Sequence, residues 1–411
     1  MARSATGILI LAAPALFLAG VLASCSPQDK TFAGINAKLA ELRKLPSPRA
    51  EDEFPPAFFE ARDAVRDWLD ARMATMAEKD NDFEFTNTLN TELKTAKLLC
   101  PQCDSSMGSF SDASGYLGEV RLSRKGAFVQ AMTQVGVQCG FDENAYLYRW
   151  DGAKWQRVWD STIQAKDGKY EPQVIDQVSI GEAQKDGPRL VSALAHFPGC
   201  KSAWQPVFYR LWTMDGPLQA PQMLVNERGT APVPQRGPAI QARLTGDDDF
   251  LVEYQAESID PDVPSRTKVA HYRVVPGAAG RFKAEKIMPY AQTPREFVEE
   301  WVTSGWPEAA VMTADAAQTA AKAEHDHLHR EKVRGDFGGP TTHCDDTAYG
   351  EWQVHVTFHN NPAKDGEERY FHMRWAPPTL FELLSVSDKP NPKCTDEVPR
   401  IDTRRSLFRR Y

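Results

Sequence analysis

The chain has 411 residues, with 48 Lys and Arg against 56 Asp and Glu, which gives a formal net charge of −8. This acidic balance argues against a protein that follows nucleic-acid phosphates, because such a protein needs a basic surface. The length suffices for two or three domains with a sizeable core. Past the first 25 residues, no apolar run reaches the roughly 18 residues expected of a membrane span.

The first 25 residues have the pattern of a secretory signal. One positive charge at Arg3 precedes an apolar run from Ile8 to Val21, which at about 14 residues is too short to span a bilayer. The segment Leu22-Ala-Ser-Cys25 follows and resembles the lipobox of bacterial lipoproteins. That resemblance implies cleavage before Cys25, fatty acylation of its thiol and its new amine, and attachment to the lipid bilayer.

The same resemblance predicts a location. Residues 1–24 would be the signal peptide and residues 25–30 a lipidated tether. Ser26 follows the acylated cysteine, and in enterobacterial lipoproteins a residue other than Asp at this position is associated with the outer membrane. We therefore expect a protein anchored in the bacterial envelope, at the outer membrane and facing the periplasm.

Residues 31–99 are expected to be helical. Apolar residues recur at intervals of three and four, which is the stripe of an amphipathic helix. A Pro-rich, charged break from Leu45 to Pro56 separates the first helix from the next. The apolar positions are Phe32, Ile35, Leu39, Leu42 and Leu45, then Phe58, Val65, Trp68, Leu69 and Met76, then Phe85, Leu89, Leu93 and Ala96.

From Gly115 the hydrophobic period changes to two, which predicts strands. A Tyr-Arg pair recurs at intervals of 61 and 63 residues, each time in a strand-like run that meets a turn. The pairs are Tyr148-Arg149, Tyr209-Arg210 and Tyr272-Arg273. We expect residues 100–292 to form three β-meander repeats of about 60 residues, with the tyrosines facing the core. Alternatively, the three arginines line one surface and bind acidic ligands.

A fourth unit is expected at residues 336–396, where Tyr370 and Arg374 repeat the pattern. It follows a helical insertion at residues 293–335, which opens with Thr293-Pro-Arg-Glu296, the form of a capping box with Pro at the first helical position.

The expected fold is mainly β, with a helical N-terminal segment and one helical insertion. Four antiparallel meanders of this size resemble the blades of a β-propeller. Two alternatives remain: an open array of meanders, and a separate C-terminal α+β domain at residues 293–390. Residues 397–411 are expected to be a basic tail.

Six cysteines follow Cys25, and an even number in an exported chain predicts disulfides. The expected pairs are Cys100 with Cys103, Cys139 with Cys200, and Cys344 with Cys394. The middle pair is 61 residues apart, which is the repeat period, so its bridge would join two neighbouring units. The first pair resembles a redox motif, but it follows a helix, and the favourable dipole at a helix start is missing.

Seven of the nine histidines lie between His325 and His372. His325 and His329 would share one helix face, while His355, His359 and His372 would share the polar face of two strands. These five residues are the candidate ligands of a zinc or copper ion. The alternative is that they are solvated side chains and that the protein has no cofactor.

Motifs for a serine nucleophile, a phosphate loop or a dinucleotide are not found in the sequence. We therefore expect a non-enzymatic binding or scaffold protein, in one version an immunity or inhibitor protein. It would meet an envelope protein or polymer through loops at one rim, and no nucleic acid. The rival expectation is an envelope hydrolase or metal-binding protein that uses the His-rich C-terminal region.

Overall fold

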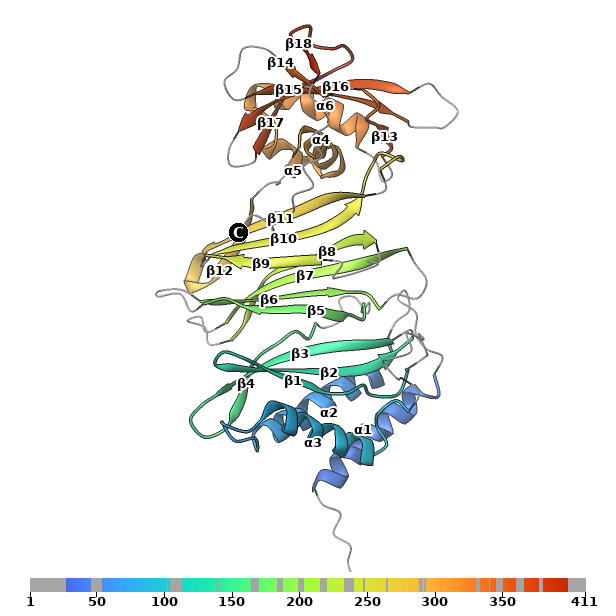
Figure 1. Ribbon diagram of the computed structural model, residues 1–411, viewed down its shortest axis with the longest axis vertical. Helices are drawn as coiled ribbons and strands as arrows, with labels where there is room; N and C mark the ends of the chain where they lie inside the picture. Colours follow the sequence, from blue (N-terminus) through green and yellow to red (C-terminus); the bar gives the residue numbers. More distant parts are fainter. Residues whose placement is uncertain are drawn as a thin grey trace, which may run out of the picture.

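Figure 1 shows the fold as a computed structural model. It describes residues 27–45, 54–101, 103, 113–138, 140–163, 170–182, 188–198, 203–214, 220–232, 240–246, 248–263, 265–287, 291, 293–329, 333–339, 341–344, 350–359, 366–376 and 380–397. Cys25, Cys139 and Cys200 lie outside these residues, so the predicted acylation site and the predicted bridge between repeats are not described.

Four antiparallel sheets are stacked in chain order along the long axis of the molecule (Figure 1). The first three are four-stranded meanders, in which each strand pairs with its neighbour in sequence. Their strands are β1 (Arg121–Lys125), β2 (Phe128–Val137), β3 (Gly140–Trp150) and β4 (Trp155–Asp160); β5 (Val174–Ile180), β6 (Arg189–His196), β7 (Trp204–Met214) and β8 (Gln222–Pro232); β9 (Ile240–Thr245), β10 (Asp249–Glu257), β11 (Ser265–Pro276) and β12 (Phe282–Ile287). The prediction of a mainly β, antiparallel fold with some helices is confirmed.

The last sheet has six strands and extends the meander pattern. Four of them follow the meander order, and two short strands are added to the sheet. The strands are β13 (Gly335–Asp336), β14 (Thr341–Cys344), β15 (Glu351–Phe358), β16 (Glu367–Ala376), β17 (Leu380–Ser387) and β18 (Cys394–Glu397). β18 pairs with β14, and β13 pairs with β15.

Three helices cover the outer face of the first sheet (Figure 1). They are α1 (Pro27–Leu42), α2 (Pro56–Met73) and α3 (Asp82–Thr95). Their apolar stripes are buried in one core with the sheet: Ile35, Leu39 and Leu89 have no exposed surface. Asn81 caps α3, because its side-chain oxygen accepts hydrogen bonds from the first-turn backbone N–H groups at 2.9 and 3.3 Å. None of the described helices is long and apolar enough to cross a bilayer.

The repeated Tyr-Arg pairs lie on the third strand of each four-stranded sheet. Tyr148, Tyr209 and Tyr272 are at most 4% exposed, so each anchors the core of its unit. The arginines behave differently from one another: two are exposed, whereas Arg210 is buried at 6% exposure. The arginines therefore do not form one uniform surface.

Consecutive sheets pack face to face. Between the first and second sheets, Trp159 of β4 meets Trp212 of β7 edge to face, with 5.1 Å between the ring centroids. Between the second and third sheets, a Cβ atom on Gly229 would lie 2.7 Å from the ring of Tyr254, so the absence of a side chain at Gly229 lets this ring pack closely against β8. The first and last sheets lie at opposite ends of the molecule (Figure 1), and the described sheets form an open row.

The helices α4 (Pro294–Thr303), α5 (Trp306–Val311) and α6 (Gln318–Leu328) share a core with the last sheet, which gives an α+β unit. Two 3₁₀ turns, Ala278–Gly280 and Asp315–Ala317, connect elements. As the capping-box pattern predicts, Thr293 Oγ1 accepts a hydrogen bond from Glu296 N at 3.1 Å, and Pro294 opens α4.

A buried charge cluster joins the third sheet to α4. Arg266 of β11 lies 2.8 Å from Glu300 and 3.4 Å from Glu299, and Lys268 lies 3.3 Å from Glu300. Burial raises the pKa of Glu300, but the two cations outweigh it and lower the pKa to about 2. Glu300 is therefore held charged inside the contact.

Candidate metal centre

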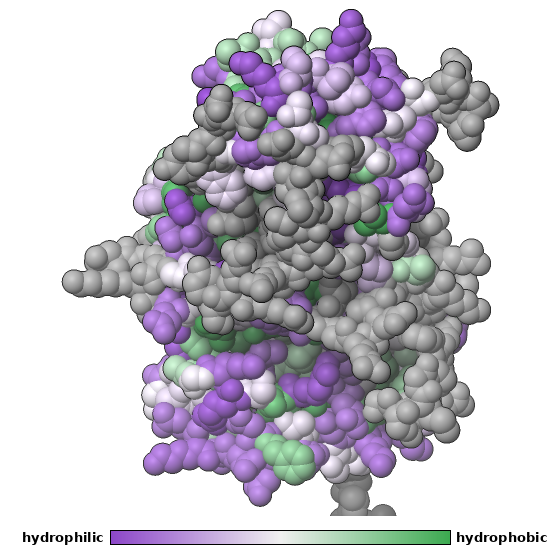
Figure 2. Space-filling view, turned by 45° about the horizontal axis from the view of Figure 1, so that its top comes forward, coloured by the Kyte–Doolittle hydropathy of each residue, from purple (hydrophilic) through white to green (hydrophobic). Residues whose placement is uncertain are grey.

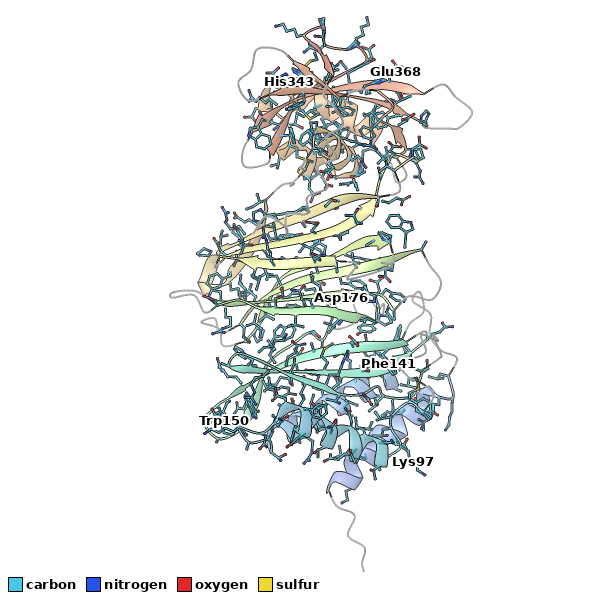
Figure 3. The ribbon with its side chains drawn as sticks, in the orientation of Figure 1. Lys97, Phe141, Trp150, Asp176, His343 and Glu368 are labelled. Carbon is cyan, nitrogen blue, oxygen red and sulfur yellow. A yellow bond between two sulfur atoms is a disulfide. The ribbon has the colours of Figure 1, made fainter. Side chains whose placement is uncertain are left out.

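The last sheet has one apolar and one polar face. Along β15, Val354, Val356 and Phe358 point to the helices and are at most 2% exposed. The alternate positions, including Glu351 and His355, point to the opposite face, because successive side chains of a strand alternate. Figure 3 shows the side chains of this end of the molecule.

Two cysteines lie on this polar face. Cys344 of β14 is paired in register with Glu351 of β15 and, across the other edge, with Cys394 of β18. The two cysteines are bonded as a disulfide, as predicted, with 3.8 Å between their Cα atoms. They are 2% and 6% exposed.

His372 of β16 completes a cluster with these cysteines. One nitrogen of its ring and the sulfur atoms of Cys344 and Cys394 all lie within 4.8 Å of one another. Among the described residues, this is the one group of three His, Cys, Asp or Glu side chains close enough to share a metal ion. We call it the Cys-His-Cys cluster.

A carboxylate orients the histidine of the cluster. His372 Nε2 lies 2.9 Å from Glu351 Oε2, and because a carboxylate can only accept, this nitrogen carries the hydrogen. Nδ1 then has the lone pair and is the nitrogen able to bind a metal. A histidine held by a carboxylate through its other nitrogen is the usual arrangement around a metal ion.

The structure separates the other predicted ligands from this cluster. His325 Nε2 donates to the carbonyl of Ser304 at 2.9 Å, and His329 Nδ1 donates to the carbonyl of Val302 at 2.8 Å. Both carbonyls belong to the C-terminal end of α4, so these histidines close that helix end. Burial lowers the pKa of His325, which favours its neutral form.

His355 and His359 also lie apart from the cluster. His355 is on the same polar face, as predicted, where its ring stacks on Tyr370 with 4.6 Å between centroids. His359 directly follows β15 and is exposed. The rings of His325 and His329 do stack on each other, with 4.9 Å between their centroids. Of the five predicted metal ligands, however, only His372 belongs to a described group of three ligand atoms close enough to share a metal ion. The partners that the sequence prediction missed are Cys344 and Cys394, which it had assigned only to a disulfide.

The predicted bridge between Cys100 and Cys103 is present. It directly follows α3 and the short link after it, where Cys100 N donates to the carbonyl of Leu117 at 2.9 Å. The helix end nearest to this bridge is a C-terminal end, whose dipole disfavours a thiolate. This bridge therefore closes a short loop after α3, and the backbone hydrogen bond from Cys100 holds that loop against Leu117.

A second cluster of titratable side chains lies between the first two sheets. Asp142 of β3 has no exposed surface and accepts hydrogen bonds from Tyr170 OH, Gln173 N and Asn144 Nδ2 at 2.9 to 3.0 Å. Burial raises its pKa to about 6, although Arg62 acts in the opposite direction. Asn144 lies on β3, Tyr170 and Gln173 lie just before β5, and Arg62 lies on α2, so the cluster connects the first two sheets with α2.

Comparisons with known proteins give no family. Among protein-family models no match is found, and none is found among curated proteins. Three similar solved structures are the GH43 endo-arabinanase from Bacillus licheniformis (12% identity, 66% of this chain and 77% of that chain, TM-score 0.20), an endo-1,4-beta-xylanase from Bacteroides thetaiotaomicron (10%, 67% and 77%, 0.18) and a structure named as a glycoside hydrolase (9%, 69% and 90%, 0.20).

All three structures carry the names of enzymes, so the prediction of a non-enzymatic binding or scaffold protein finds no support among them. That prediction is therefore withdrawn. Identities and TM-scores of this size carry no argument about the activity of this chain, and the proposed function rests on the geometry of the last sheet.

Proposed function

We propose that this chain is a lipid-anchored envelope protein that binds a thiophilic metal ion at Cys344, His372 and Cys394. The observation that carries the proposal is the convergence of two sulfur atoms and one histidine nitrogen within 4.8 Å. Thiolate and imidazole ligands favour zinc and copper(I) over magnesium or calcium. Three protein ligands leave a fourth position of a tetrahedral zinc ion for water or for a further ligand.

The cysteines bind the metal as thiolates, so the disulfide must first be opened. A dithiol reductant supplies two electrons and two protons, and the sulfur–sulfur bond gives two thiols while the reductant becomes a disulfide. A divalent ion then replaces the two thiol protons, which are released to solvent. The site therefore has two exclusive states: an oxidised state without metal and a reduced state with metal.

The surroundings of the cluster support this assignment. Both cysteines are almost fully buried, while the side chain of His372 is 17% exposed, which leaves a path for an ion from the polar face. Glu351 fixes the ring of His372 and adds a negative charge beside it. A carboxylate in this position raises the basicity of the ligand nitrogen.

The anchor and location are part of the same proposal. The lipobox-like segment ending at Cys25 supports attachment to a bilayer through fatty chains, and Ser26 supports the outer membrane facing the periplasm. Intact-mass analysis of the native protein should find a polypeptide that begins at Cys25 and carries fatty acyl groups. A polypeptide that begins upstream of Cys25 would contradict the anchor.

We also propose that the four-stranded units are propeller-like blades arranged in a row. Each is an antiparallel meander packed face to face with the next, which is the relation between neighbouring blades of a propeller.

Zinc titration of the full mature protein tests the metal site. After reduction, the protein competes with a coloured chelator for zinc in the absence of oxygen. The wild type should bind one zinc ion in the reduced state and lose this binding when it is oxidised. Replacing Cys344 and Cys394 by Ser should abolish the binding.

A matched control is the double replacement of Cys100 and Cys103 by Ser, which removes the other described disulfide and leaves the Cys-His-Cys cluster intact. This variant should bind zinc like the wild type. Zinc binding that survives loss of Cys344 and Cys394 but disappears with Cys100 and Cys103 would overturn the proposal.

A further inference from the structure

The first helix begins very close to the proposed anchor. Helix α1 starts at Pro27, inside residues 25–30 that were predicted to be the tether, so only Ser26 separates the helix from Cys25. Two residue steps of fully extended chain span at most about 7 Å. An acylated Cys25 lies at the membrane surface, so the start of α1 is held within that distance of the lipid headgroups.

The start of α1 projects from one end of the stack (Figure 1). This end is made by α1, α2 and α3, and the last sheet with the Cys-His-Cys cluster lies at the opposite end. In Figure 3, Lys97 marks the helical end, while His343 and Glu368 mark the far end. The helical end is therefore the end of the molecule that lies next to the proposed anchor.

The helical end has a surface suited to lipid headgroups. A shallow groove of about 450 Å³ lies between α1 and α3, lined by Phe32, Ala33 and Thr91 among others. Phe83 at the start of α3 is 72% exposed, which gives this helix one apolar ring open to solvent. Exposed charges of both signs, such as Glu84 and Lys94, prevent strong repulsion from an anionic membrane.

The visible side of the N-terminal unit is mainly hydrophilic, with a few apolar residues between the polar ones (Figure 2). This side of the unit offers little apolar surface to a bilayer. The short tether must therefore provide most of the attachment.

We infer that the α1–α3 end docks on the lipid surface, held there by the two-residue tether, so that the stacked sheets display the Cys-His-Cys cluster away from the membrane. This inference rests on the proposed lipid anchor, and it does not depend on metal binding. The partner is the bilayer to which Cys25 is attached.

Fluorescence quenching tests the orientation. The acylated full-length mature protein is reconstituted in vesicles of phosphatidylethanolamine and phosphatidylglycerol that carry a nitroxide on their headgroups. An environment-sensitive dye is placed on Thr91→Cys, at the exposed face of α3, or on Glu368→Cys, in the last sheet. The dye at position 91 should be quenched several-fold more than the dye at position 368, and labelled wild type measures any background.

A longer tether provides the matched control. Inserting about 20 Gly and Ser residues between Ser26 and Pro27 keeps the anchor but allows a separation of about 25 Å, so quenching at position 91 should fall to the level at position 368. Equal quenching at both positions in the original protein, or unchanged quenching with the long tether, would overturn the inference. A missing anchor is recognised separately, because the protein would then fail to float with the vesicles at all.

Discussion

The Nε2 atom of His372 lies 2.9 Å from Oε2 of Glu351, on the strand next to it in the sheet. This contact decides which nitrogen of the ring carries the hydrogen and which keeps the lone pair that a metal needs. The carboxylate accepts the Nε2 hydrogen and leaves the lone pair on Nδ1. In the proposed reduced site, the ring of His372 would bind the metal together with the two cysteine sulfurs.

Replacing Glu351 by Ala should weaken zinc binding of the reduced protein by about 10- to 100-fold, because the ring of His372 loses its orientation. Competition with a chelator of known affinity measures this loss. Glu382→Ala is the matched control, since Glu382 lies in the same sheet and pairs with Arg374 at 2.7 Å. If the two variants bind zinc equally well, Glu351 has no role at the centre.

Asp142 should make the free energy of unfolding increase as the pH falls through about 6, because its pKa is raised in the folded protein. Burial raises its pKa from 3.8 to about 6, so between these values the folded protein binds a proton that the unfolded protein does not bind. This contribution to the free energy of unfolding therefore rises as the pH falls through 6, and it is unfavourable to folding above 6.

The comparison of wild type with Asp142→Asn isolates this contribution. Between about pH 7.5 and about pH 5, the wild type should gain about 1 kcal/mol relative to the variant. Urea unfolding at the two pH values measures the difference. A pH-independent difference between the two proteins would show that Asp142 titrates normally.

The buried pair of Arg266 and Glu300 should be costly to break. Arg266→Met leaves two buried carboxylates without their main cation, at a cost of about 3–5 kcal/mol. Glu300→Gln should cost less, because Arg266 keeps Glu299 at 3.4 Å. Thermal unfolding of both variants tests this order, and the reverse order would contradict the described contacts.

The pKa of Glu300 gives the same contact a pH signature. Since its pKa is lowered from 4.5 to about 2, its contribution to stability is complete above 4.5 and is lost as the pH falls toward 2. Glu300→Gln should therefore be less sensitive to acid than the wild type over this range.

Trp212 should be essential to the stacking of the first two sheets. It is 4% exposed and packs edge to face on Trp159, so Trp212→Ala should cost about 3–5 kcal/mol. Trp375→Ala is the control, because Trp375 is 38% exposed and should change stability much less. Urea unfolding measures both, and similar small losses would contradict the tight packing of these sheets.

Local patterns in the sequence predicted most of the elements. The spacing of Ile35 and Leu39 predicted a helix, and the recurrence of Tyr148, Tyr209 and Tyr272 predicted equivalent strands in three units. These elements could be predicted because the spacing of apolar residues in helices and strands repeats within a few residues of sequence. The capping box at Thr293 could be predicted for the same reason, since it is a pattern of four consecutive residues.

The arrangement of these elements and the metal centre were harder to predict. The order of strands in the last sheet depends on β18 returning to pair with β14, which brings Cys394 opposite Cys344. No local pattern encodes that pairing or its register. His372 was correctly placed on the polar face, but its neighbours there come from strands that are distant in sequence.

X-ray absorption at the zinc edge tests the central claim most directly. We predict that the reduced, zinc-loaded full mature protein has two sulfur ligands at about 2.3 Å and a histidine nitrogen at about 2.0–2.1 Å. His372→Ala should remove the nitrogen contribution while both sulfurs remain. A spectrum with only nitrogen and oxygen ligands would contradict a centre built on Cys344, His372 and Cys394.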